Sequence, residues 1–285
     1  MNVKKALVFG ASFIVLGCGT PSVPDSKTNW DRYEQELLDI VDGKECGLGT
    51  TALGFCSSDV SSARYNSQIM GKECKGDPVT YLRNIYEASS ATEIDRAKSS
   101  IKQALQRDYF ATPLPNSNSE RLIEALYHRD QALRFLKIAD VEADRNLMDS
   151  IKWVTICGHA YFAKLKIDSY LDQHGFKALE NDKDFAKKAW ILIQHSDFDP
   201  DYQLRRSDQF AQSPHTHMKK FAGYLKDRGL VGLGKEQVCG TQLTCINGER
   251  APFATSDRRR LNERRLSLGM TTIEERLAKA SRCRK

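Results

Sequence analysis

Apolar positions recur with a helical period through most of the chain. Only one short segment, from Gln242 to Phe253 around Asn247-Gly248, has the turn signature of a β-hairpin with a type I′ turn. The sequence therefore predicts a mainly α fold: a multi-helix domain with one small β-hairpin near the C-terminal end. Apolar spacings of three and four predict helices at 30–41, 78–86, 94–105, 119–137, 147–154, 161–171, 182–194, 200–213 and 216–227, with further helix from 261.

Local start and stop signals support these helices. Ser90 and Glu93 have the spacing of a capping box, and Asp199 before Pro200 is a typical helix start. Gly175 and Gly229 are each expected to end a helix. The helix at 182–194 is apolar nearly all round, which predicts that it is buried on most sides.

The N-terminus has the features of an export signal. A short basic segment with Lys4 and Lys5 precedes an apolar run that ends in Gly17-Cys18. This segment resembles the lipobox of bacterial lipoproteins, which implies a signal peptide at 1–17, cleavage before Cys18 and acylation (palmitate) of its thiol. The alternative is an ordinary secretory signal. A lipid anchor would hold the chain on the cell membrane or outer membrane, with its domain in the periplasm or outside the cell.

The remainder divides by composition. The predicted parts are a tether at 18–29, an N-terminal helical, cysteine-bearing region at 30–115, a helical domain at 119–278 and a basic tail at 279–285. Without Lys4 and Lys5 the net charge is +4, from 41 basic and 37 acidic residues. Residues 258–285 hold ten basic and three acidic residues, so the rest is about −3. The charge therefore excludes a chain-wide nucleic-acid surface, and the basic end is either a solvated helix or a contact with anionic lipid.

Seven cysteines follow Cys18, and export would place them in an oxidising compartment where disulfides form. Because seven is odd, at least one thiol is expected to be free or to pair between chains. Cys46, Cys56 and Cys74 lie in a Gly/Ser-rich stretch that a disulfide could staple, with zinc as the less favoured alternative. Cys239 and Cys245 could close a small loop unless the segment between them is a straight strand.

The candidate chemistry centres on the stretch from Trp190 to Gln203, where an apolar helix ends in polar groups. His195 has the ordinary pKa of a general base or acid, about 6.5. Asp130, Asp197 or Asp227 could fix its tautomer, and His195, Asp130 and Asp227 are the candidate catalytic residues. The alternative is a core histidine within a polar network that fixes helix packing.

Further polar residues are candidates for ligand binding. Arginines could hold an anionic group through their fork of donors, and glutamines could orient a polar substrate or a water. No metal site and no cofactor are expected, because the sequence holds no phosphate-binding glycine loop, metalloprotease motif or nucleophile elbow. The ligand-binding candidates are Arg134, Gln131, Gln194, Asp197, Gln203, Arg228, Gln242 and Arg265.

These residues form an ordered series over more than half of the chain, and residues 119–278 resemble the bacterial domain-of-unknown-function family DUF6624. The chain departs from the family pattern at Lys177, where a proline is usual, and at Cys239, where a tyrosine is common. The resemblance implies no established reaction. The matching motifs are Asp130-Gln131 with Arg134, Gln194-His195 with Asp197 and Gln203, Asp227-Arg228, Gln237 with Gly240-Thr241-Gln242, and Asn262 with Arg265 and Gly269.

Two functions are compatible with this sequence. The first is a membrane-anchored envelope lipoprotein whose polar site binds or hydrolyses a small polar ligand, which requires the candidate residues to converge on an opening. The second is a non-catalytic binding lipoprotein, such as a toxin inhibitor or an envelope assembly factor. The expected partners are the lipid bilayer, through acylated Cys18, and a small polar ligand or envelope protein, without nucleic acid.

Overall fold

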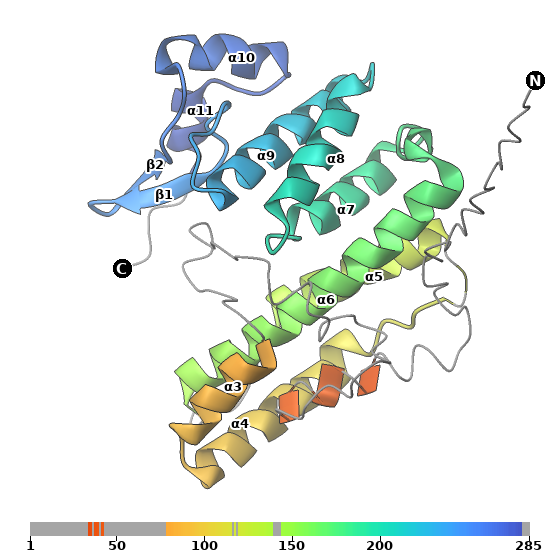
Figure 1. Cartoon of the computed structure of the whole chain (residues 1–285), viewed down its shortest axis with the longest axis vertical. Coiled ribbons are helices and arrows are strands. Elements are labelled where there is room, and N and C mark those ends of the chain that lie inside the picture. Colours follow the sequence, from red (N-terminus) through yellow and green to blue (C-terminus); the bar gives the residue numbers. More distant parts are fainter. Residues whose placement is uncertain are drawn as a thin grey trace, which may run out of the picture.

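The computed structural model describes residues 34–35, 37–39, 41–42, 78–115, 117, 119–138 and 144–280. The predicted signal peptide, Cys18, the tether, Cys46, Cys56, Cys74 and the end of the basic tail at 281–285 lie outside these residues. The described chain is mainly helical with a single antiparallel hairpin, which confirms the predicted fold class (Figure 1). None of the helices in these ranges is long and apolar enough to cross a bilayer.

The helices and strands are α3 (Pro78–Glu87), α4 (Ala91–Ala104), a π-helical turn (Leu105–Tyr109), α5 (Glu120–Arg134), α6 (Arg145–His174), a 3₁₀ turn (Phe176–Leu179), α7 (Lys183–Gln194), α8 (Pro200–Gln212), α9 (Thr216–Gly232), β1 (Leu243–Ile246), β2 (Glu249–Pro252), a 3₁₀ turn (Arg258–Arg260), α10 (Leu261–Ser267) and α11 (Ile273–Ala278).

The local helix starts agree with the sequence signals. At α4, the Ser90 hydroxyl accepts from the Glu93 amide and the Glu93 carboxylate accepts from the Ser90 amide, so the capping box is complete. At α8, the Asp199 carboxylate accepts from the Tyr202 amide at 2.8 Å, and Pro200 occupies the first turn. These caps satisfy amides that the helices themselves leave without partners.

The long helix α6 replaces the two helices predicted at 147–154 and 161–171. It continues through Gly158, because the whole segment from Val154 to Ala160 is buried between other helices and tertiary packing outweighs the low propensity of one glycine. Figure 1 shows α6 running between α3 and α4 on one side and α7 to α9 on the other. Residues of α4, α5, α6, α7, α8 and α9 share one hydrophobic core.

Gly229 does not end α9, contrary to the sequence prediction; the helix continues to Gly232. A Cβ atom at position 229 would lie 2.9 Å from both Leu204 Cγ and the Pro200 carbonyl oxygen. Glycine is therefore needed here because α8 and α9 approach each other closely. The chain turns instead at Gly234, whose φ of +70° suits a glycine.

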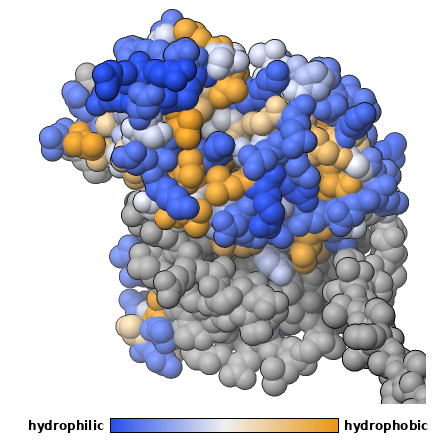
Figure 2. Space-filling model, turned by 45° about the horizontal axis from the view of Figure 1, so that its top comes forward, coloured by the Kyte–Doolittle hydropathy of each residue, from blue (hydrophilic) through white to orange (hydrophobic). Residues whose placement is uncertain are grey.

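The C-terminal part begins where α9 ends. The hairpin pairs Ile246 with Glu249 across Asn247 and Gly248, whose φ angles of +52° and +83° are those of the predicted type I′ turn. The short helices α10 and α11 lie beside it (Figure 1). Among the residues that are coloured in Figure 2, hydrophilic ones predominate, and apolar residues show between them.

Candidate functional site

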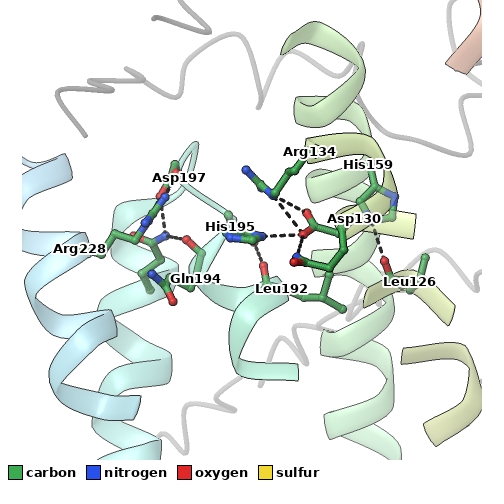
Figure 3. A network of polar contacts seen from close by, with 12 residues as sticks. Leu126, Asp130, Arg134, His159, Leu192, Gln194, His195, Asp197 and Arg228 are labelled. Carbon is green, nitrogen blue, oxygen red and sulfur yellow. Dashed lines mark hydrogen bonds and ion pairs between the residues drawn. The ribbon is translucent and has the colours of Figure 1, made fainter. Parts of the chain in front are cut away.

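The centre of the candidate site is an acid–base pair between two packed helices. Asp130 lies on the buried face of α5 with 1% of its side chain exposed, and His195 is the residue at which α7 ends. His195 Nδ1 is 2.9 Å from Asp130 Oδ2, although 65 positions separate the two residues in sequence. Figure 3 shows the imidazole and the carboxylate facing each other across the gap between the helices. Asp130 is therefore the acid that fixes the orientation of His195.

The Asp130 carboxylate accepts two further side-chain donors. Gln131 Nε2 is 2.8 Å from Oδ2, and Arg134 Nε is 3.0 and 3.1 Å from the two oxygens. Burial alone would raise the pKa of Asp130, but the charges of His195 and Arg134 and the hydrogen bond from His195 together hold it well below its usual range. Asp130 is therefore a carboxylate at any physiological pH.

The tautomer of His195 follows from this partner. An ionised carboxylate can only accept, so Nδ1 carries the proton. Burial lowers the pKa of His195, against the opposing effect of Asp130, so the ring is neutral near pH 7 and Nε2 has a free lone pair. No group in the described part of the chain bonds to Nε2. The His195 side chain is 16% exposed, so the ring is not fully enclosed.

Arg134 lies beside His195 at the end of α5. Its Nε donates to Asp130, whereas its two terminal nitrogens have no acceptor among the described residues. The side chain is 16% exposed, and Figure 3 shows it extending from α5 toward His195. Arg134 and His195 thus contact the same carboxylate, that of Asp130.

A second charged cluster lies on the other side of His195 (Figure 3). Arg228 on α9 donates from two nitrogens to the two oxygens of buried Asp197, and Gln203 Nε2 is 3.0 Å from Asp197 Oδ1. Burial raises the pKa of Asp197, but Arg228 outweighs this and lowers it. Gln203 also donates to the Gln194 carbonyl oxygen at 2.8 Å. This cluster therefore fixes the turn between α7 and α8 that carries His195.

Asp227, Gln242 and Arg265 do not join these residues. The Asp227 carboxylate is bound by the amides of Val238, Cys239 and Thr241 at 2.7 to 2.8 Å, and burial raises its pKa. Gln242 donates to the Thr241 hydroxyl.

Arg265 is equally occupied in the C-terminal part, where it donates to the carbonyl oxygens of Thr271 and Cys239 at 2.7 and 2.6 Å. The structure therefore does not place Asp227, Gln242 and Arg265 in one site with His195. Their hydrogen bonds fold the segment after α9.

The polar core behind Asp130 was not singled out from the sequence. His159 on α6 is fully buried; its Nε2 is 3.0 Å from the Leu126 carbonyl oxygen and its Nδ1 is 2.8 Å from the Tyr109 hydroxyl. Burial lowers the pKa of His159 to about 4. A histidine and a tyrosine at 50 positions' separation give no local signal, so only the packing of α6 reveals the pair.

Other candidate features lie apart from His195. A cavity of about 510 Å³ opens where α5 begins and α6 ends, beside Ser119, Tyr170 and His174. Cys239 is a free, buried thiol, so no disulfide joins it to Cys245. Burial raises the pKa of this thiol to about 12. In the described ranges, no group of three acidic, histidine or cysteine side chains is arranged to hold a metal ion.

Comparison with known proteins adds no further information on this site. Neither a family model, a curated protein nor a solved structure matches the chain.

Proposed function

We propose that this chain is a lipid-anchored envelope protein in which His195 is the general base of a site for a small polar ligand. The supporting observation is the 2.9 Å contact between His195 Nδ1 and Asp130, which leaves Nε2 without a partner among the described residues. Acylation of Cys18 and the resemblance to DUF6624 are part of the same proposal. Palmitate incorporation that is lost in Cys18→Ala would test the anchor.

In this proposal each residue has one chemical task. His195 Nε2 takes a proton from a water or from a hydroxyl of the ligand, and the resulting imidazolium is stabilised by Asp130. Gln131 and Arg134 hold the carboxylate in place. General-base assistance of this kind contributes on the order of 10² to 10⁴ in rate. Hydrolysis of a small polar ligand is the reaction class that such a pair serves most directly.

A titration of His195 tests the proposal. NMR of the full-length chain in detergent, with isotope-labelled histidine and assignment by His195→Asn, should show a ring that titrates below pH 6.5. Asp130→Asn should lower the pKa of His195 further, because it removes the charge that favours the imidazolium. Asp227→Asn is the matched control and should leave this pKa unchanged. A ring that never titrates and ignores Asp130→Asn would contradict a working base.

A non-catalytic binding function is the second candidate. Phe135 directly follows Arg134 and is 74% exposed, which is unusual for a large apolar side chain. An exposed aromatic at the rim of a polar site is typical of a contact with another protein. In that case Phe135→Ala would abolish capture of an envelope protein, whereas His195→Asn would have no effect.

A further inference from the structure

We infer that the ligand of this site is a small oxyanion, a carboxylate or a phosphate group, bound by the terminal nitrogens of Arg134 next to His195 Nε2. This inference rests on the proposed function and specifies the class of ligand.

The Arg134 guanidinium is held in one orientation by Asp130. Its Nε donates to both oxygens of Asp130, which lies on the same helix four residues earlier, so the plane of the group is fixed before any ligand arrives. A guanidinium has five N–H donors, and about four remain on the two terminal nitrogens. Parallel N–H bonds of this fork match the oxygens of carboxylates and phosphates.

The carboxylates around the site are already paired with cationic or basic side chains. Asp130 is shared by Arg134 and His195, and Asp197 is paired with Arg228. From α6, His159 is neutral and buried, and Lys152 donates to the Arg134 carbonyl oxygen at 3.0 Å. Asp149 offsets the charge of Lys152.

When His195 accepts a proton, Asp130 alone therefore faces two cations, the imidazolium and Arg134. An anion on the Arg134 fork would compensate this second positive charge. Anion binding and protonation of His195 are thus coupled, and each favours the other.

A cationic or neutral ligand fits less well. The oxygens of Asp130 and Asp197 already accept from nitrogen donors, so a cation would have to displace an arginine. A neutral ligand would leave the charge on the fork without a counter-charge in a partly desolvated position.

The test measures the pKa of His195 in the full-length chain by NMR, with inorganic phosphate or acetate added at constant ionic strength in chloride. In the wild type we expect one of the two anions to raise the pKa of His195 by about half a unit or more and to saturate. Arg134→Gln should weaken this binding about tenfold or more, since a charge-assisted contact is lost. Arg260→Gln, at an exposed arginine paired with Glu263, is the control and should bind as the wild type does.

Each outcome decides one point. Saturation by phosphate alone, or by acetate alone, identifies the class of oxyanion. If His195 titrates but neither anion shifts it, or if Arg134→Gln responds as the wild type does, the anion inference is wrong and the proposed base stands. If His195 does not titrate at all, both fail. If Arg134→Gln does not fold, Arg134→Lys is the second variant, because it keeps the positive charge but lacks the two terminal nitrogens of the guanidinium. Anion binding by Arg134→Lys that equals that of the wild type would also overturn the inference.

Discussion

His159 Nε2 donates a hydrogen bond to the Leu126 carbonyl oxygen, which fixes the ring as the Nε2–H tautomer. A carbonyl only accepts, so Nδ1 has the lone pair that accepts from the Tyr109 hydroxyl. The ring therefore joins α6 to α5 and to the π-helical turn as a neutral group. Protonation would place a charge in a site with no exposure to water.

Acidification should therefore destabilise the fold through His159. Its folded pKa is about 4 and its unfolded pKa about 6.5, so the unfolded state binds more protons in between. This contribution to stability is complete above pH 6.5 and falls by about 3 kcal/mol as the pH drops to 4. Urea unfolding across this range would measure it. His159→Gln, which keeps a donor and an acceptor but does not titrate, should show a shallower dependence; an identical slope would contradict the assignment.

Asp227→Asn should destabilise the segment after α9 and leave His195 unaffected. The asparagine amide cannot accept from the Val238, Cys239 and Thr241 amides at both ends, so at least one buried N–H loses its partner, at about 1–3 kcal/mol. Hydrogen exchange of these three amides should accelerate. The control is Asp201→Asn, at an exposed position on α8, where a change of about 0.5 kcal/mol or less is expected. Equal effects of the two variants would refute the anchoring role.

Arg228→Met should cost about 3–5 kcal/mol, since it leaves the buried Asp197 carboxylate without its cation. The pKa of Asp197 should rise, because Arg228 is what lowers it. Adding Asp197→Asn should restore part of the stability. Denaturant unfolding of both variants would measure this, with exposed Arg260→Met expected to stay within about 0.5 kcal/mol. No recovery in the double variant would mean that the charge on Asp197 is not the source of the loss.

The Cys239 thiol should resist alkylation in the native protein. Burial raises its pKa to about 12, which makes the thiolate at pH 8 about thousandfold rarer than for a free cysteine. Mass spectrometry after iodoacetamide treatment should find residue 239 unmodified in buffer and modified in urea. Native labelling at the rate of an exposed thiol would contradict the burial.

The elements that the sequence predicted correctly are those decided by neighbouring residues. The capping box at Ser90, the Asp199-Pro200 start and the Asn247-Gly248 turn depend on groups within four positions of one another. The predicted break between the helices at 147–154 and 161–171 and the predicted helix end at Gly229 were wrong, because the surroundings of these positions come from other helices. The sequence alone does not distinguish a glycine that allows two helices to approach from a glycine that ends a helix.

The site was predictable only in part for a similar reason. His195 and Asp130 were both candidates, but three acids competed for the histidine, and only folding shows which one faces it. Asp227 directly precedes Arg228, and Asp130 precedes Arg134 by four positions, so both acids have an arginine nearby in the sequence. The Asp227 carboxylate nevertheless accepts from backbone amides. Hydrogen-bond partners 65 positions apart depend on how α5 packs against α7.

The close approach of α8 and α9 at Gly229 also restricts which mutations the chain tolerates. A methyl group at this position would meet Leu204 and the Pro200 carbonyl oxygen. Arg228 directly precedes Gly229, and its partner Asp197 lies three positions before Pro200. The distance between α8 and α9 therefore also determines the distance between the two partners of this ion pair. A single added carbon at position 229 would therefore displace the Arg228–Asp197 ion pair and, through it, the turn that carries His195. Substitutions at position 229 are thus coupled to the electrostatics of His195, although no contact joins the two residues directly.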